Sequence, residues 1–150
     1  MDIQLGNDGK KIVEGVPNCS FINLEPIRES RGELCFTEGN NKEIPFPIQR
    51  IFWIYNVPKG KNRGGHANWK CTEAIFALSG SFDIYVDDGF THQTYTINTP
   101  NKGILIPAGV WCLLQNFRPG TVCFVAASTK YDNKYYVNNY QKFLEKIRCK

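Results

Sequence analysis

The chain has 150 residues, of which 42% are hydrophobic and 21% are charged, and its formal net charge is +4. This length predicts one soluble domain over residues 1–150, which can bury a core without help from a metal or a disulfide. The mild positive charge forms no basic stripe, and no apolar run approaches the ~20 residues of a membrane-spanning helix, so we expect neither nucleic acid nor membrane as a partner.

Short apolar or alternating runs follow one another along the chain, separated by Gly, Pro, Asn and Asp. Short runs at this regular spacing are typical of a β-sandwich or a β-barrel. The aromatic content of 13% also favours strands. The predicted strands cover residues 21–24, 33–37, 50–57, 74–78, 82–86, 93–97, 103–106, 110–115 and 121–127.

The hydrophobic period changes near the C-terminus. Val137, Tyr140, Leu144 and Ile147 are spaced as on one face of a helix. We therefore predict one amphipathic helix over residues 136–148, packed against the outside of the barrel.

The six cysteines are scattered and include no C-x-x-C pair, and the first residues do not form a signal peptide. Several cysteines lie inside apolar strand patterns, where a free cysteine behaves as a small buried hydrophobic residue. We expect reduced thiols in a cytoplasmic protein.

Two groups of residues carry the spacing of the two cupin motifs. The first motif has the form H-x-H, three or four residues, Glu, six residues and Gly, and the second has the form P-x-G-x-x-H-x-x-x-N. The chain resembles the cupin superfamily because it matches the two motifs in order, with His66, Asn68, Glu73 and Gly80, and then Pro107, Gly109, Cys112 and Asn116.

A metal-binding cupin would place its ligands at positions 66, 68, 73 and 112, which are His, Asn, Glu and Cys in this chain. A transition-metal site needs several good nitrogen or sulfur ligands in a fixed geometry. We therefore expect no metal and no cofactor. A metal-dependent cupin enzyme is the less favoured alternative, because His66, Glu73 and Cys112 could form an incomplete zinc set.

Nearly the whole chain, from about residue 20 to 145, more closely resembles the WxcM-like sugar-nucleotide 3,4-ketoisomerases of deoxysugar and polysaccharide biosynthesis. The resemblance implies an all-β, RmlC-like jelly-roll barrel of the cupin type with one C-terminal α-helix. It also implies a homodimer in which N-terminal strands are exchanged between barrels. The matching stretches are residues 30–32, 50–55, 63–67, 78–81, 86–89 and 107–111, followed by 127–128, 131–132 and 136.

Enzymes of this family move the ketone of dTDP-linked 4-keto-6-deoxyglucose from C4 to C3 without a metal. The C3 proton lies beside the C4 ketone, so a positioned histidine that titrates near neutral pH can remove it. The resemblance assigns this base to His66. It also implies that Arg63 and Arg50 bind the diphosphate through paired hydrogen bonds, and that Asn68 and Glu73 hold the sugar oxygens.

The chain departs from the family pattern at two positions that often hold histidine, which are Asn68 and Cys112 here. Asparagine can hydrogen-bond a sugar oxygen but cannot carry a proton. The alternative hypothesis is therefore a cupin that binds a sugar nucleotide without converting it. Among the tryptophans, Trp111 is a candidate for the substrate site, whereas Trp53 is expected to pack in the core.

Overall fold

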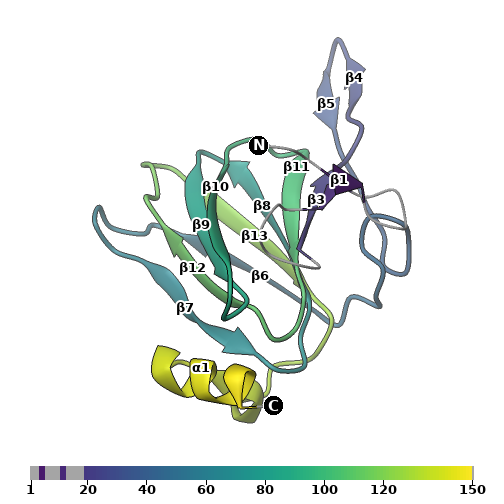
Figure 1. Ribbon diagram of the computed structural model, residues 1–150. Helices are drawn as coiled ribbons and strands as arrows, with labels where there is room; N and C mark the ends of the chain where they lie inside the picture. Colours follow the sequence, from purple (N-terminus) through teal and green to yellow (C-terminus); the bar gives the residue numbers. More distant parts are fainter. Residues whose placement is uncertain (1–3, 6–10, 13–18, 150) are drawn as a thin grey trace.

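Two antiparallel β-sheets face each other in the computed structural model, which describes residues 4–5, 11–12 and 19–149 (Figure 1). In the described residues, the larger sheet has seven strands, in the order β1 (Gln4–Leu5), β2 (Lys11–Ile12), β3 (Ser20–Asn23), β11 (Lys102–Ile106), β8 (Glu73–Ser79), β13 (Val122–Ala127) and β6 (Arg50–Tyr55). The smaller sheet has five, in the order β10 (His92–Ile97), β9 (Phe82–Asp87), β12 (Trp111–Gln115), β7 (Arg63–Asn68) and β14 (Tyr136–Val137). A separate hairpin and two helices complete the fold: β4 (Ile27–Glu29) with β5 (Gly32–Leu34), the short η1 (Asn133–Tyr135) and α1 (Tyr140–Arg148).

The main core lies between the two sheets, where alternate residues of each strand point inward. In β9, Phe82, Ile84 and Val86 are buried, while the residues between them are partly exposed, as expected when successive side chains point to opposite faces. These residues pack with Ile75 of β8 and Ile104 of β11 from the facing sheet. This packed layer fixes the strands that carry the candidate site.

A second hydrophobic layer covers part of the outer face of the larger sheet. Phe76 of β8 and Leu105 of β11 point outward and are buried beneath Ile44 and Phe46, which belong to the loop before β6. The loop therefore shields the middle of this sheet from solvent.

The outer face of β6 is not shielded in this way. β6 is the edge strand of the larger sheet, and its Trp53 side chain is 56% exposed. Trp53 faces outward because it alternates with Arg50, Phe52 and Ile54, which are the partly buried residues of the strand. The expectation that Trp53 packs in the core is therefore wrong.

α1 packs against the outer face of the smaller sheet, below the barrel in Figure 1. Its fully buried Phe143 lies with its ring centroid 5.8 Å from that of Trp69 and 5.6 Å from that of Trp111. Tyr140, at the start of the helix, donates a hydrogen bond to the carboxylate of Asp87 at the end of β9. Neither helix in the described part of the chain is long and apolar enough to cross a membrane.

The predicted helix over residues 136–148 is too long at its N-terminal end. α1 begins at Tyr140, because Asn139 caps it by accepting a hydrogen bond from the amide of Lys142 at 3.0 Å. The preceding residues Tyr136 and Val137 form β14, which pairs with β7. Tertiary pairing therefore overrides the helical spacing that includes Val137.

The strand that carries His66 is absent from the sequence-based prediction. β7 contains Gly64 and Gly65, whose φ angles of 79° and 75° lie in the left-handed region that favours glycine. The two glycines interrupt the alternating pattern from which strands are predicted, although the backbone still pairs with β12 and β14.

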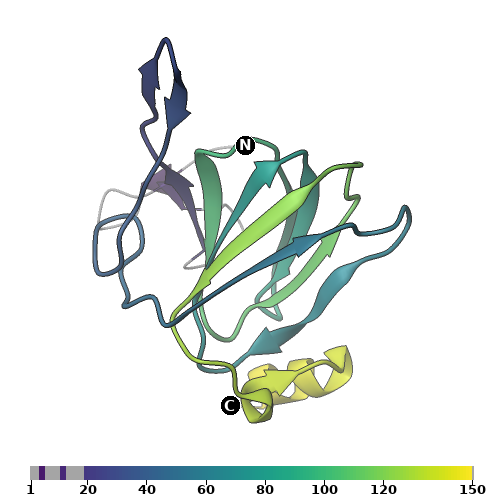
Figure 2. The same cartoon turned by 180° about the vertical axis from the view of Figure 1, so that it is seen from behind.

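The β4–β5 hairpin stands clear of the barrel, as Figures 1 and 2 show from opposite sides. All residues of its two strands are exposed. The strand predicted over residues 33–37 ends at Leu34, because β5 pairs with β4 and with no described strand of the barrel.

Candidate active site

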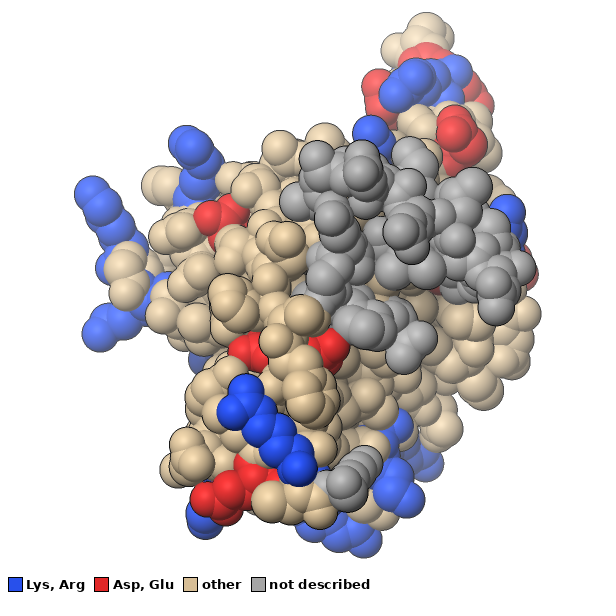
Figure 3. Space-filling model, in the orientation of Figure 1, with Lys and Arg blue, Asp and Glu red and all other residues tan. Residues whose placement is uncertain are grey.

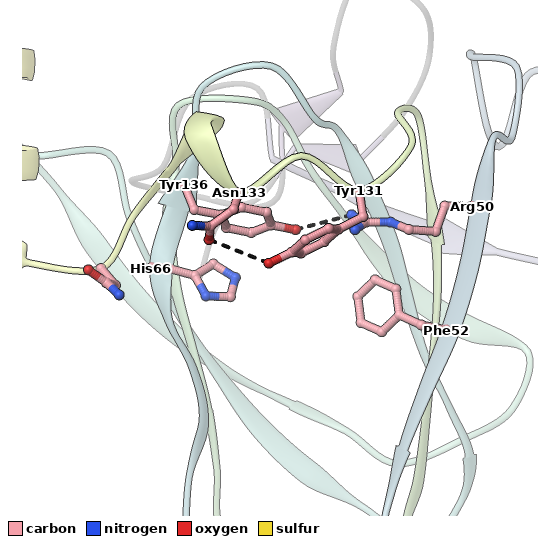
Figure 4. Close-up of a pocket in the computed structure, with 7 residues that line it drawn as sticks. Arg50, Phe52, His66, Tyr131, Asn133 and Tyr136 are labelled. Atoms are coloured by element: carbon pink, nitrogen blue, oxygen red, sulfur yellow. Dashed lines mark hydrogen bonds between the residues drawn. The ribbon is translucent and has the colours of Figure 1, made fainter.

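A cavity of about 490 Å³ lies where β6, β7 and the segment after β13 meet. This volume suits a small organic ligand. Figure 4 shows the side chains converging from β6, from β7 and from the segment that leads to β14. The lining residues are Arg50, Phe52, His66, Tyr131, Asn133, Tyr136 and Asn138.

His66 is held on β7 opposite Cys112 of β12, next to a point where the pairing of the two strands changes register. At Gly64, an added Cβ would lie 3.1 Å from the carbonyl oxygen of Cys112, which is a tight contact, and the positive φ of this residue also disfavours a side chain. Burial lowers the pKa of His66 below its ordinary value of 6.5, and the positive charges of Arg50 and Arg63 lower it further. At neutral pH the imidazole is therefore uncharged and can accept a proton.

Arg50 lies between two aromatic rings and a tyrosine hydroxyl. The carbon of its guanidinium is 5.2 Å from the ring centroid of Phe52 and 5.6 Å from that of Tyr131, within cation–π range. Its Nη2 donates a hydrogen bond to the hydroxyl of Tyr136 at 3.1 Å. Burial disfavours the charge of Arg50, but the contacts with Tyr136, Cys71 and Glu73 raise its pKa overall. The cavity therefore contains a fixed positive charge.

Backbone pairing holds the C-terminal segment against β7. Tyr136 of β14 is paired with Asn68 of β7, and the amide of Trp69 donates to the carbonyl of Tyr135 at 2.9 Å. This register places the ring centroid of Tyr136 4.9 Å from that of His66, with an interplanar angle of 83°. The two rings make an edge-to-face contact.

Of the residues singled out from the sequence, His66 and Arg50 line the cavity, whereas Asn68 does not. The side-chain Oδ1 of Asn68 accepts hydrogen bonds from the amides of Lys70 and Cys71, both at 2.9 Å. Such bonds from an asparagine side chain to following amides stabilise a turn. Asn68 is buried and holds the connection between β7 and β8.

Glu73 and Trp111 are not brought to the surface of the cavity either. Glu73, the first residue of β8, is 8% exposed, and burial raises its pKa while the charge of Arg50 opposes the shift. Trp111 is also 8% exposed and packs against Tyr140 and Phe143 of α1. Its ring belongs to the contact between sheet and helix.

Arg63 lines a second cavity, of about 340 Å³, further along the same two strands. Lys61, Trp53 and Tyr55 lie around this cavity, at the end where the loop over residues 56–62 joins β6 to β7. Figure 3 shows Lys and Arg side chains projecting from this end of the molecule, on the left. We use the term β6–β7 seam for the surface between strands β6 and β7 that runs from His66 in the first cavity to Arg63 in the second.

The four positions at which a metal-binding cupin would have its ligands do not fit a metal. The Oδ1 of Asn68 is already bonded to two amides. Burial, followed by the nearby charge of Glu73, raises the pKa of Cys112 well above its ordinary value, and a thiol that keeps its proton is a poor ligand. Within the described residues, no three His, Cys, Asp or Glu side chains are grouped so as to hold a metal ion.

The sequence did not identify the cavity residues Tyr131, Asn133, Tyr136 and Asn138 as functional. Residues 131–132 and 136 were recognised as similar to the family's closing segment, but that similarity assigned them no role. The pairing of β14 with β7, which brings Tyr136 to His66, joins segments far apart in the sequence.

Known proteins resemble this chain over most of its length. The family model described as "FdtA: WxcM-like, C-terminal" matches residues 17–148. A curated relative from Aneurinibacillus thermoaerophilus, a TDP-4-oxo-6-deoxy-alpha-D-glucose-3,4-oxoisomerase, is 35% identical over 129 residues, which cover 84% of this chain and 92% of the relative.

Solved structures share both the sequence and the fold. The TDP-quinovose 3,4-ketoisomerase of Campylobacter jejuni is 35% identical, with a TM-score of 0.83 and coverage of 87% of this chain and 99% of that one. A mutant of the 3,4-ketoisomerase of Thermoanaerobacterium thermosaccharolyticum, in complex with TDP-4-keto-6-deoxyglucose, is 29% identical, with a TM-score of 0.86 and coverage of 89% and 96%. These likenesses confirm the predicted cupin-type barrel with a C-terminal helix. The chain belongs to the WxcM-like family of sugar-nucleotide 3,4-ketoisomerases.

Proposed function

We propose that this chain is a 3,4-ketoisomerase that moves the ketone of a TDP-linked 4-keto-6-deoxyhexose from C4 to C3. The observation that carries the proposal is the cavity in which His66, kept neutral by burial and by two arginines, lies beside Arg50 and Tyr136. The substrate class follows from the family, because the curated relative acts on TDP-4-oxo-6-deoxyglucose.

In this proposal His66 is the base that removes the C3 proton. The electrons of the C3–H bond form a double bond between C3 and C4, and the C4 carbonyl oxygen gains the negative charge. The positive charge of Arg50 stabilises that oxygen as the charge develops. When O3 loses its proton and both O4 and C4 gain one, the ketone stands at C3, and no oxidant or reductant has been consumed.

Arg63 and Lys61 bind the diphosphate at the other end of the β6–β7 seam. Arg63 lies three residues before His66 on β7, but their partners on β12, Leu114 and Cys112, are only two residues apart, so about 7 Å separates the two Cα atoms at the rise of an extended strand. This separation suits a hexose at His66 whose diphosphate extends toward Arg63. A guanidinium binds phosphate oxygens through paired hydrogen bonds.

We also propose that the protein is a homodimer. Ile51, Trp53 and Tyr55 on β6, and Ile27 and Leu34 on the hairpin, are all 47–59% exposed. Exposed apolar surface next to an unpaired strand edge is typical of a protein–protein contact. The predicted exchange of N-terminal strands concerns about the first 20 residues, most of which lie outside the described part of the chain.

The proposed enzyme works in the cytoplasm and needs neither metal nor cofactor. All six cysteines, which lie within residues 19–149, are free. Free thiols persist in the reducing cytoplasm, which supports this location.

A proton NMR time course with TDP-4-keto-6-deoxyglucose in heavy water tests the function. Conversion gives new signals of a 3-keto sugar with deuterium at C4. His66→Asn is expected to abolish conversion, because an amide cannot accept the C3 proton. The matched control is His92→Asn, which removes the exposed second histidine on β10 and leaves conversion unchanged.

Two results would contradict the proposal. Unchanged turnover by His66→Asn would remove His66 from the role of base. Substrate that binds to the wild-type protein but is never converted would favour the alternative of a sugar-nucleotide-binding cupin without catalysis.

A further inference from the structure

The isomerisation needs a second group that moves a proton, because hydrogen must leave O3 and reach O4. Asn68, at the position of the family's second histidine, carries no transferable proton, and its oxygen is bonded to two amides. Glu73 and Cys112 do not line the cavity. Besides His66, the described lining residues with a hydroxyl that can donate and accept a proton are the two tyrosines, Tyr131 and Tyr136.

The hydrogen bonding of Tyr136 leaves its proton free for a ligand. Arg50 donates to the Tyr136 oxygen at 3.1 Å. A guanidinium has no acceptor, so the phenolic hydrogen is not used in this bond. The positive charge also stabilises the phenolate that remains when the proton leaves. The Tyr136 and His66 rings are in contact, so one sugar can reach both.

Tyr131 is bonded differently. Its hydroxyl donates to the Oδ1 of Asn133 at 3.4 Å, and its side chain is 66% exposed. In Figure 4 the bond from Tyr131 to Asn133 lies on the left of the two tyrosine rings, and the bond from Arg50 to Tyr136 lies on the right. Tyr131 contacts Arg50 through the face of its ring and not through its hydroxyl. The charged and titratable groups placed around Tyr136 are Arg50 on β6, His66 on β7 and Tyr131 before η1.

We propose that Tyr136 is the second acid–base residue of this site and carries a proton between O4 and O3 of the sugar, an assignment that rests on the proposed function. In the first step His66 takes the C3 proton while Tyr136 gives its proton to O4, which produces a neutral enediol and a phenolate beside Arg50. In the second step the phenolate takes the proton from O3, and the imidazolium returns a proton to C4. Both residues end as they began.

Tyr136→Phe tests this role. The expected kcat falls by about 100- to 10,000-fold, as is usual when a general acid–base group is lost. The Kd for TDP changes little, because the proposed diphosphate contacts lie at the Arg63 end of the seam. In the pH profile of kcat, the residual activity of Tyr136→Phe still falls at low pH, where His66 becomes protonated. It no longer falls at high pH, because that limb of the profile requires the phenol of Tyr136, which must be protonated at the start of the reaction. Tyr131→Phe is the matched control, because it removes a phenol from the same cavity and keeps the basic limb.

Replacing Tyr136 with fluorotyrosine distinguishes a catalytic role of the phenol from a positioning role. This variant also tests the proposal if Tyr136→Phe does not fold. It retains the acceptor for Arg50 but has a more acidic phenol, so the basic limb moves to lower pH. A basic limb that stays in place would overturn the assignment, as would a Tyr136→Phe variant with full kcat. Failure of the wild-type protein to convert substrate would instead overturn the proposed function.

Discussion

His66 and His92 are the two histidines of the chain, and only their surroundings distinguish them chemically. His92 lies exposed on β10, whereas His66 is half-buried in a cavity beside two arginines. Burial and positive neighbours both disfavour the imidazolium, so the unprotonated ring is the form that meets the substrate. The same residue type is thus a surface group at one position and the proposed base at the other.

Arg63→Gln is expected to raise the pKa of His66 toward 6.5. Removal of a positive neighbour makes the imidazolium less unfavourable, so the proton is retained to higher pH, and the acid limb of kcat/KM moves upward with it. A proton NMR titration of the imidazole signals measures this shift, with His66→Asn used to assign the two histidines.

Lys59→Gln is the control for this titration. It removes one positive charge from the neighbouring loop, on a residue that lines a different cavity and does not contribute to the shift of His66. An unchanged or lower pKa in Arg63→Gln would contradict the electrostatic account of His66.

At the scale of the element, β7 and its following turn decide the geometry of the site. Gly64 and Gly65 give β7 its two residues with positive φ, and at Gly64 the backbone lies close to β12. The turn after β7 leads the chain into β8. β14 then pairs with the end of β7 and delivers Tyr136. The side chain of Asn68 holds the turn, so this position is used for structure where the family often has a histidine.

Asn68→Ala is expected to lower the free energy of unfolding by about 1–3 kcal/mol, because the amides of Lys70 and Cys71 lose their acceptor in a buried turn. Asn68→Asp keeps an acceptor oxygen at the same place and is expected to lose much less. Urea unfolding of the three proteins measures the difference. Equal stability of Asn68→Ala and wild type would mean that the two bonds do not hold the turn.

At the scale of the whole molecule, the two faces of the barrel are treated differently. α1 packs on the outer face of the smaller sheet, while β6 at the edge of the larger sheet exposes Ile51, Trp53 and Tyr55, and the β4–β5 hairpin exposes Ile27 and Leu34 among charged residues. These exposed apolar residues form the surface proposed for the dimer contact. That the 150 residues form one domain stays a prediction.

Light scattering after size exclusion is expected to give about twice the chain mass of 17.1 kDa. Trp53→Lys, which puts a charge in the proposed contact, is expected to shift the protein toward the monomer. Phe90→Lys is the matched control, because Phe90 is 71% exposed in the turn between β9 and β10 and is not part of that surface. A wild-type mass of 17 kDa would contradict the dimer.

The sequence by itself determined the strands with uninterrupted alternation, such as β9, the C-terminal helix, and the two residues His66 and Arg50 that do line the cavity. These features depend on local periodicity and on short motifs, which remain readable along the chain. It also determined the family, because several motifs occur in order.

Only the tertiary structure decided what surrounds His66. β7 was missed because its glycines carry no hydrophobic pattern, and β14 was missed because pairing with a distant strand overrode local helical spacing. The side chain of Asn68 does not line the cavity, because its oxygen accepts hydrogen bonds from two backbone amides of the following turn. Tyr136 lines the cavity because β14 pairs with β7, a segment far away in the sequence. Contacts of this kind depend on where the chain returns in space, which the order of residues does not state locally.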